Sequence, residues 1–249
     1  MKQYLSIIIP CYNELENLKR GVLVEVENFL KKQEFSWEVI ISDDASTDGS
    51  REFITEFTRN RPGFIFLKNH KGGKAFAIKS AVEIATGQFV LFADMDQSTP
   101  ISEFKKIKTF LDQGALVVIG SRGFKRENFP IIRKIASPAF LLFRRLLILR
   151  SIKDTQCGFK CFQANVLKQA FKKLYVFKRQ RGSGWRVGAW DVELLFVVLK
   201  NNPPFEEVTV DWSDTDTSTS KQRKFIHESI EMLKEVVRVR LNNVLGKYD

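Results

Sequence analysis

The sequence predicts an α/β protein built on one mainly parallel β-sheet with helices on both faces. Short runs rich in β-branched and aromatic residues recur through the first 120 residues, and helical periodicities separate them. Acidic loops follow several of these runs. At 249 residues with 44% hydrophobic content, the chain is long and apolar enough to bury such a core.

Five runs have the length and composition of buried strands, and they cover residues 4–9, 37–42, 64–67, 88–93 and 115–120. Between them, apolar residues recur at three- and four-residue spacing, as on one face of a helix. These sets are Leu18, Val22, Val26 and Phe29; Phe53 and Phe57; Ala75, Ile78, Val82 and Ala85; and Phe104, Ile107 and Leu111. Such alternation is typical of a parallel sheet, which binds ligands beyond the carboxyl ends of its strands.

Three acid-bearing loops follow the first, second and fourth expected strands. They read CYNE, DDASTDGS and DMDQSTP, and they occupy residues 11–14, 43–50 and 94–100. Because the carboxyl ends of parallel strands share one sheet edge, the three loops are expected to converge there. Asp and Ser after a strand also cap the next helix, which is the plainer interpretation of the second loop taken alone.

Asp94 and Asp96 form a D-x-D pattern directly after a buried strand. On extended backbone the two carboxylates point the same way, about 7 Å apart, with Met95 turned aside. A hard divalent cation such as Mg²⁺ or Mn²⁺ would relieve their repulsion, since it prefers carboxylate oxygen and keeps substrate phosphates as further ligands. Paired surface aspartates are common, so it is the position at a strand end that favours a metal–diphosphate site.

The charge balance favours polyanionic partners. Forty Lys and Arg against 29 Asp and Glu give a net charge of +11, which fits nucleic acid, phosphorylated small molecules or an anionic lipid surface. Residues 128–153 contain no acid, and basic residues interrupt an apolar background there. A core helix with a basic exposed side would explain this segment, but we favour a cationic amphipathic segment in a membrane interface. Acids at the strand ends argue against the alternative of a nucleic-acid-binding module.

Cysteine use and apolar runs bear on location. Three cysteines form no even disulfide framework, and with two histidines in the chain a zinc site is hard to assemble. The N-terminal MKQYLSIIIPCYNE lacks the pattern of a signal peptide, and no apolar run nears the ~20 residues of a spanning helix. The expectation is a cytoplasmic protein, peripheral on the cytoplasmic face of a membrane.

Two further helices are expected in the second half of the chain. Residues 190–201 read as a buried helix with Asp191 near its N-terminus. The final helix carries apolar residues on one face and basic residues near its C-terminal end, where cations suit the helix dipole. Its apolar set is Ile226, Ile230, Leu233, Val237 and Leu241.

Taken in order, the motifs resemble those of glycosyltransferase family 2. The first half carries IIIPCYNE, SDDASTDGS, GGKAFAIKSA and ADMDQ, and the second carries DTQCGFKCF, WDVELL, VDW and TSK. The second set is similar to dolichyl-phosphate and polyprenyl-phosphate β-glucosyltransferases and to the related dolichol-phosphate mannose synthases. The resemblance implies a GT-A fold, a single Rossmann-like and mainly parallel sheet flanked by helices, with amphipathic helices toward the C-terminus.

The resemblance also implies one domain over residues 1–249 and an inverting sugar transfer. Residues 1–120 would bind the nucleotide sugar, and residues 121–249 would bind the acceptor through membrane-interface helices. The implied reaction moves a sugar, with UDP-glucose as the favoured donor, to a polyprenyl or dolichyl phosphate, using Mg²⁺ or Mn²⁺. A GDP-mannose-dependent polyprenyl-phosphate mannosyltransferase, or a family 2 enzyme with another acceptor, is the alternative.

Matching the family motifs position by position gives the site residues. The nucleotide sugar would contact Pro10, Tyr12, Glu14, Asp44, Lys74, Asp94 and Asp96, the last two as metal ligands. The acceptor phosphate would contact Arg122, Arg133, Ser137, Gln156, Ser220 and Lys221. Asp154 and Asp191 would be the catalytic residues at the reacting sugar, although Asp191 also suits a cap for a helix over 192–200.

Three departures from the family pattern bear on function. Ala45 replaces the usual glycine of the second loop, which matters only if that backbone needs a positive φ. Ala75 stands where the family has a second glycine. DMDQST matches neither the DADLQ of the mannosyl enzymes nor the DADGAT of the glucosyl enzymes, which leaves the sugar open.

Overall fold

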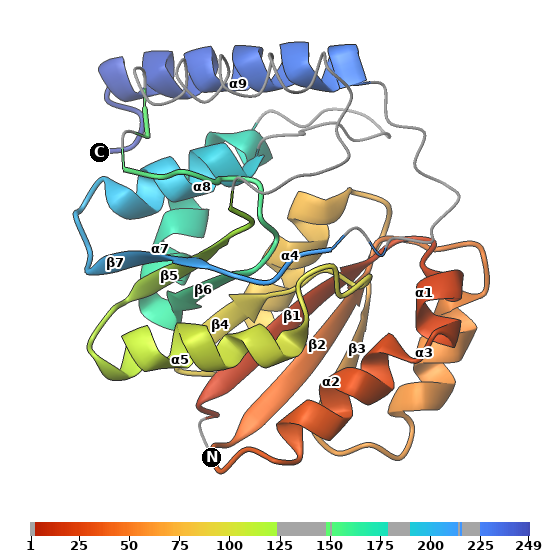
Figure 1. Cartoon of the computed structure of the whole chain (residues 1–249). Helices are drawn as coiled ribbons and strands as arrows, with labels where there is room; N and C mark the ends of the chain where they lie inside the picture. The colour runs from red at the N-terminus through yellow and green to blue at the C-terminus, as the bar shows by residue number, and fades with distance from the viewer. Residues whose placement is uncertain (1–2, 124–147, 150, 179–189, 214, 216–224) are drawn as a thin grey trace.

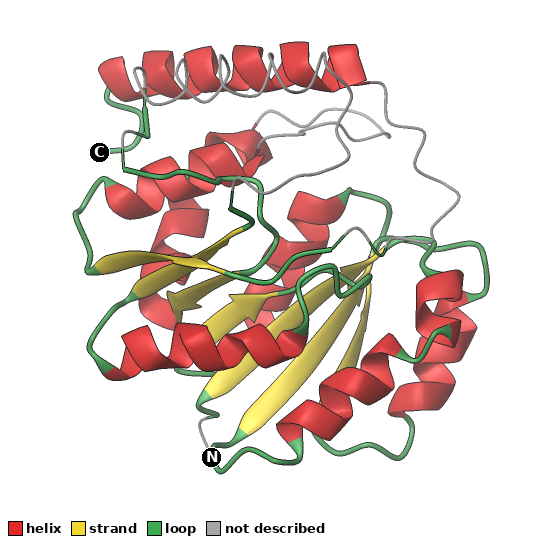
Figure 2. Ribbon diagram, viewed as in Figure 1, coloured by secondary structure: helices red, strands yellow, loops and turns green. Residues whose placement is uncertain are grey.

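The computed structural model describes residues 3–123, 148–149, 151–178, 190–213, 215 and 225–249. Within these ranges seven strands form one sheet in the order β3-β2-β1-β4-β6-β5-β7, with helices on both faces (Figure 1, Figure 2). The strands are β1 (Leu5–Cys11), β2 (Trp37–Asp43), β3 (Phe64–Lys68), β4 (Phe89–Phe92), β5 (Val117–Ser121), β6 (Lys160–Gln163) and β7 (Phe205–Thr209). The expected mainly parallel α/β sheet is therefore confirmed.

The described helices alternate with the strands through the first half of the chain. They are α1 (Leu15–Lys19), α2 (Val22–Leu30), α3 (Ser50–Thr58), α4 (Lys74–Ile84), η1 (Ile101–Glu103), α5 (Phe104–Asp112), α7 (Ala164–Lys173), η2 (Tyr175–Lys178), α8 (Trp190–Leu199) and α9 (Phe225–Val244). Each of the expected helical sets falls in one or more of these helices, since apolar spacing of three and four residues marks the face that packs on the sheet.

The sheet is buried on both faces, which explains its continuous apolar strands. β1 runs parallel to β2 and to β4, with Leu5 opposite Trp37 on one side and Phe89 on the other. Successive side chains point to opposite faces, so Ile8 packs with α4, α7 and α8, while Ile7 packs with α2, α3 and α5. A strand with water on one face would instead alternate apolar and polar residues.

Two strands, β6 and β7, lie outside the expectations from sequence. β6 runs antiparallel between β4 and β5, and β7 pairs in parallel with β5 at the sheet edge. β6 spans only four residues and β7 carries Glu206 and Glu207, so neither shows the apolar run of the other strands. Because β6 is antiparallel, its first residue, Lys160, pairs with Phe92 at the edge where β4 ends.

The final helix, α9, packs along α8 (Figure 1). Val236 and Val239 are fully buried in the core on this side of the sheet. The apolar face expected from the sequence is a different one, because Leu233, Val237 and Leu241 are 38%, 42% and 56% exposed. The described side chains of the expected stripe therefore face away from the core. None of the helices in the described ranges is long and apolar enough to cross a bilayer.

Candidate active site

A cavity of about 40 Å³ lies at the carboxyl ends of β1 and β4. It brings together residues from both halves of the chain that the family motifs single out, namely Pro10, Lys74, Asp94, Gln156 and Asp191. Lys160 and Trp190 also line it, and so does Gly158. Strand β1 contributes Pro10 and the loop after β4 contributes Asp94, with additional walls from β6 and α8. Of the three loops expected to converge, those of residues 11–14 and 43–50 meet each other, where the N–H of Asn13 donates to Ser46 Oγ at 2.9 Å, but they do not line this cavity.

Asp94 is held between α4 and the loop before β6. Lys74 Nζ lies 2.5 Å from Asp94 Oδ1. A Cβ atom placed on Gly158 would overlap with the other carboxylate oxygen, Asp94 Oδ2. The glycine of DTQCGFK is therefore required by close approach, since any side chain there would displace the aspartate.

The D-x-D segment is a turn, so the extended backbone expected for Asp94 and Asp96 is wrong. β4 ends at Phe92, the N–H of Gln97 donates to the Asp94 carbonyl at 3.2 Å, and Gln97 has a φ of 51°. The two carboxylates have different neighbours as a result: Asp96 Oδ1 accepts the N–H of Ser98 at 2.9 Å.

The backbone of Asp96 fixes this turn to two distant segments. Its carbonyl accepts from Arg20 Nη2 at 2.5 Å and from Thr215 Oγ1 at 2.9 Å. Arg20 also donates to the Thr215 carbonyl, and the N–H of Ser213 donates to the Ser98 carbonyl at 2.9 Å. The turn is thus held by its main chain, and the aspartate side chains are not its only anchors.

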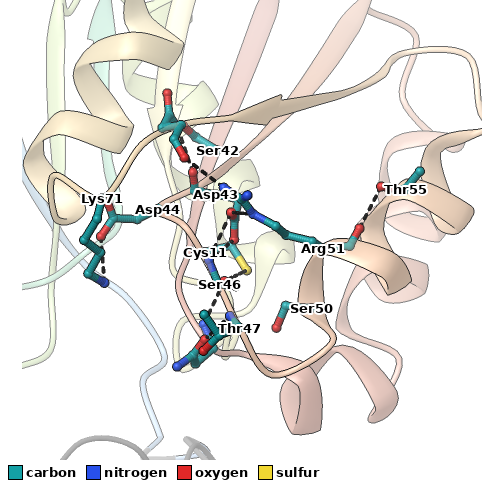
Figure 3. Close-up of polar contacts among 12 residues, drawn as sticks. Cys11, Ser42, Asp43, Asp44, Ser46, Thr47, Ser50, Arg51, Thr55 and Lys71 are labelled. Atoms are coloured by element: carbon teal, nitrogen blue, oxygen red, sulfur yellow. Dashed lines mark hydrogen bonds and ion pairs between the residues drawn. The ribbon is translucent and has the colours of Figure 1, made fainter.

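Asp44, at the end of β2, positions the loop that leads into α4 (Figure 3). Its Oδ1 accepts the N–H groups of Gly72 and Gly73 at 2.6 and 2.7 Å, and its Oδ2 lies 3.1 Å from Lys71 Nζ. The carboxylate is buried. Asp44 therefore has a structural role in placing Lys74, beside the nucleotide contact that the family motif implies.

The neighbouring Asp43 anchors the loop between β2 and α3 by an ion pair with Arg51. It is fully buried, and Arg51 Nε donates to its Oδ2 at 2.5 Å (Figure 3). Both carboxylate oxygens accept the N–H of Ser46, at 3.3 and 3.2 Å. Burial together with the nearby acids, Asp43 first, raises the pKa of the Cys11 thiol well above its usual value, so this cysteine stays a thiol.

Ala45 lies in this loop with a φ of 63°, in the left-handed region that favours glycine. Ala45→Gly should relieve about 1–2 kcal/mol of backbone strain and cost about 0.5–1 kcal/mol of chain entropy. We expect a gain of roughly 0.5–1 kcal/mol, seen as a rise of about 2 °C in thermal unfolding. Ala85→Gly, at a φ of −59°, is the matched control and should lower the melting temperature. Equal losses for both variants would contradict the strain at Ala45.

Tyr12 and Glu14 lie on the loop after β1 and differ in exposure. The Tyr12 ring is exposed, and Lys71 Nζ lies 2.8 Å from its centroid. Glu14 is buried and accepts from Asn17 Nδ2 at 2.7 Å, while its N–H donates to Ser50 Oγ at 3.0 Å. Tyr12 thus presents a ring on which a nucleotide base could stack, whereas Glu14 shapes the loop.

Arg122 and Asp154 form a two-pronged ion pair. Arg122 Nε donates to Asp154 Oδ2 at 2.7 Å and Nη2 donates to Oδ1 at 2.9 Å, and the Arg122 N–H adds a bond of 3.2 Å. Burial opposes ionisation of Asp154, but the hydrogen bonds and charge of Arg122 outweigh it and hold the pKa of the carboxyl well below its usual value. The geometry assigns Asp154 to orienting Arg122.

Asp191 lies in the first turn of α8 and faces Lys160 across the cavity. Its Oδ2 lies 3.7 Å from Lys160 Nζ, and its Oδ1 accepts the N–H of Val192 at 3.0 Å. Burial raises the pKa of Asp191 above its usual value, and the charges of Lys160 and Lys74 partly oppose that shift. Because α8 already begins at Trp190, Asp191 lies inside its first turn and is not the cap that a helix over 192–200 would have; its side chain lines the cavity.

Several expected positions fall outside the described residues. Among the acceptor-phosphate candidates, Arg122 and Gln156 are described, whereas Arg133, Ser137, Ser220 and Lys221 are not. The basic, acid-free segment lies almost wholly outside as well. In the part of the chain that the structure describes, no cluster of three or more His, Cys, Asp or Glu could hold a metal by itself.

Sequence reasoning missed Lys160, Trp190 and Gly158. All three belong to motifs quoted above, DTQCGFKCF and WDVELL, in which the predicted site residues are Asp154, Gln156 and Asp191. A lysine within an apolar segment was the available signal for Lys160, because Lys is almost never fully buried unless paired.

Comparison with known sequences gives a consistent picture. Residues 6–174 match the profile described as Glycosyl transferase family 2. Dolichyl-phosphate beta-glucosyltransferase of Dictyostelium discoideum is 32% identical, over 98% of this chain and 76% of that protein. The proteins of the same name from Saccharomyces cerevisiae and Homo sapiens are 29% and 27% identical, each over 98% of this chain and 76% and 77% of their own lengths.

Solved structures match the fold over nearly the whole chain. Glucosyl-3-phosphoglycerate synthase from Mycobacterium tuberculosis, in complex with Mn²⁺, UDP and glucosyl-3-phosphoglycerate, superposes with a TM-score of 0.62 at 15% identity, over 98% of this chain and 80% of that chain. The mannosyltransferase PcManGT from Pyrobaculum calidifontis, in complex with GDP-Man and Mn²⁺, gives 0.59 at 16% identity, over 98% and 65%. At these identities the likeness establishes the fold.

Proposed function

The chain belongs to glycosyltransferase family 2, and from that premise we propose that it transfers glucose from UDP-glucose to a dolichyl or polyprenyl phosphate. The observation that carries the proposal is the cavity in which the donor-half residues Lys74 and Asp94 meet Gln156 and Asp191 of the second half. The choice of glucose and of a dolichyl-type acceptor is supported by relatives of that name over nearly the full chain.

The donor diphosphate would bind at the N-terminus of α4. Lys74 is the first residue of that helix, where the unpaired N–H groups and the helix dipole favour anions. Asp44 fixes Gly72 and Gly73 immediately before it. The ammonium of Lys74 would then share its charge between Asp94 and a phosphate oxygen of the departing UDP, which lowers the barrier to bond cleavage.

Asp94 and Asp96 fit a divalent cation of the Mg²⁺ or Mn²⁺ type. Such ions are commonly held by one or two carboxylates together with substrate phosphates and water. Two aspartates on one turn are therefore enough ligands from the protein. The bound ion would neutralise charge that develops on the leaving diphosphate. Two neighbours of the same fold were solved with Mn²⁺, which agrees with this choice.

The acceptor side needs positive charge and positioning more than a strong base. A polyprenyl phosphate is already an anion at neutral pH, so one of its oxygens can attack C1 of the sugar while the bond from C1 to the diphosphate breaks and the configuration inverts. Arg122, held in place by Asp154, would bind that phosphate with a pre-oriented guanidinium. Arg133, Ser137, Gln156, Ser220 and Lys221 are its proposed partners.

The exposed stripe of α9 supports docking on a membrane surface. Leu233, Val237, Leu241 and Val244 recur at helical spacing and are 38%, 42%, 56% and 69% exposed. The exposed basic residues of this end of the chain are Lys234, Arg240 and Lys247. An apolar stripe with basic flanks suits a helix lying in an anionic lipid interface, where the acceptor is found.

Removing this stripe should release the protein from lipid. The triple variant Leu233→Gln, Val237→Gln and Leu241→Gln is expected to bind anionic vesicles at least tenfold more weakly, because each buried side chain contributes about 1 kcal/mol or more. Vesicle co-sedimentation measures the change. Val24→Gln with Ile84→Gln alters side chains that are 44% and 43% exposed on other helices, and this control should bind as the wild type does. Equal binding by the triple variant would exclude the stripe.

A transfer assay tests the proposed reaction. The purified protein is offered radiolabelled UDP-glucose, UDP-GlcNAc or GDP-mannose with a polyprenyl phosphate and Mn²⁺ or Mg²⁺, and label is counted in the organic phase. Label from UDP-glucose that disappears on addition of EDTA is the expected result. Label from GDP-mannose alone would reassign the enzyme to mannosyl transfer, and no label from any donor would refute the acceptor.

A further inference from the structure

Lys160 is a buried, charged side chain that lines the cavity. The proposed reaction assigns no role to it. It opens β6, opposite Phe92 of β4, and is only 4% exposed. Its ammonium donates to the carbonyl of Cys157, and it faces Asp191 Oδ2 at 3.7 Å. That distance is longer than a hydrogen bond, so a buried ammonium and a carboxylate that is 14% exposed line one cavity without closing on each other.

Such a pair is costly unless something completes it. Each ion loses its hydration on burial, and the mutual attraction repays that loss only when hydrogen bonds satisfy the remaining donors and acceptors. An ammonium has three hydrogens, and the Cys157 carbonyl takes one of them. The arrangement is therefore suited to a ligand group that fits between the ammonium and the carboxylate.

A hydroxyl group is the chemical match for this position. It can donate its hydrogen to Asp191 and accept one from Lys160 at the same time. A phosphate or carboxylate would gain from Lys160 but would be repelled by Asp191. The cavity, of about 40 Å³, has room for a few water-sized groups, which suits a hydroxyl between the two charges.

The surrounding walls agree with a sugar. Trp190 lines the same cavity from α8 and offers an aromatic surface, while Gln156 contributes an amide with donors and acceptors. Lys74, together with a cation held by Asp94, would serve the diphosphate. The cavity thus combines aromatic and hydroxyl-binding groups with a separate place for the diphosphate.

We propose that Lys160 is a specificity residue for the donor sugar, and that its ammonium and the Asp191 carboxylate together bind one hydroxyl group of the transferred hexose. The inference rests on the proposed glucosyl transfer and assigns a partner to one hydroxyl of the glucose. Removing either the hydroxyl or the ammonium should therefore remove the same interaction.

The test pairs enzyme variants with donors that lack single hydroxyl groups. UDP-glucose and its 2-, 3-, 4- and 6-deoxy analogues are compared by kcat/KM, with a polyprenyl phosphate as acceptor. The wild type should reject one of these deoxy donors by about 100-fold or more, because a site built for a hydroxyl leaves polar groups unpaired without it. Lys160→Met should lose activity with UDP-glucose but discriminate against that deoxy donor by less than about fivefold. If the effects of removing the hydroxyl and of removing the Lys160 ammonium do not add, the two groups are in contact.

Two further variants make the outcome decisive. Lys168→Met removes a lysine that donates to the carbonyl of Ala85 at 2.8 Å, outside the cavity, and it should keep the wild-type donor ratios. Asp191→Asn keeps the side-chain shape and should weaken discrimination at the same hydroxyl, which retains the test if Lys160→Met does not fold.

The results separate this inference from the reaction itself. If Lys160→Met lowers kcat/KM by one factor for every donor, or if the wild type treats all deoxy donors as it treats UDP-glucose, Lys160 does not read a hydroxyl, although glucosyl transfer stands. A wild type that transfers no glucose at all refutes the reaction before the question of Lys160 arises.

Discussion

Replacing Asp96 with alanine is expected to lower kcat/KM about a thousandfold and to leave the fold intact. The activity loss follows because the carboxylate is proposed to hold the ion that neutralises the leaving diphosphate, a contribution of several kcal/mol in the transition state. The fold should survive because the Asp96 carbonyl, which alanine keeps, makes the contacts to Arg20 and Thr215. The side chain contributes a bond to the Ser98 N–H.

Three measurements check this expectation together. The transfer assay gives kcat/KM, titration calorimetry gives binding of UDP with Mn²⁺, and thermal unfolding should shift by no more than a few degrees. Asp112→Ala removes an exposed carboxylate that pairs with Lys108 far from the cavity, and it should leave all three unchanged. Full activity of Asp96→Ala with metal present would show that the D-x-D assignment is wrong.

Arg122→Ala is expected to cost about 3 kcal/mol of unfolding free energy and most of the activity. The arginine and its partner Asp154 are 17% and 9% exposed, and removal of one member of a largely buried pair leaves the other charge unpaired. Changing both residues at once, Arg122→Met with Asp154→Leu, should cost less stability than Arg122→Ala alone, because no buried charge remains. Urea unfolding measures the free energy of each variant.

The pH dependence of this pair has a definite sign. The pKa of Asp154 is depressed in the folded state, so its contribution is complete above the ordinary carboxyl pKa of about 4 and is lost as the pH falls through the folded value. Without Arg122, burial alone would raise that pKa, and protonation would relieve the variant. The stability gap between wild type and Arg122→Ala should therefore be largest near pH 7 and shrink in acid. A gap that stays constant down to pH 3 would contradict the ion pair.

The first half of the fold was predictable because its strands are buried on both faces. Runs such as SIIIP and VIIS do not alternate apolar and polar residues, so the sequence alone identifies them as buried strands. β6 was not predictable, because four residues containing Lys160 give no apolar run, and its position depends on a long-range antiparallel pairing. β7, an edge strand that contains Glu206 and Glu207, was not predictable either, because it also lacks an apolar run.

The members of the cavity were predictable in part, and its contacts were not. Pro10, Lys74, Asp94, Gln156 and Asp191 line one cavity, whereas other described candidates do not: Tyr12, Glu14, Asp44, Asp96, Arg122 and Asp154. The sequence could not reveal that the Asp44 carboxylate accepts hydrogen bonds from Gly72 and Gly73, because those bonds depend on how two loops meet. Nor could it reveal the turn at Asp94, because a D-x-D pattern after a strand fits extended backbone as well as a turn.

The antiparallel insertion of β6 makes the two halves of this enzyme inseparable. β4 and β5 are consecutive strands along the described chain, yet β6 lies between them in the sheet. A fragment ending after β5 would keep the D-x-D turn but would leave β4 unpaired on one side and β5 unpaired on both, and unpaired strand edges invite aggregation. Nascent chains must therefore wait for residue 160 before the sheet closes and for residue 191 before the cavity is complete, and exchange of the later part of the chain between relatives would have to carry β6 with it.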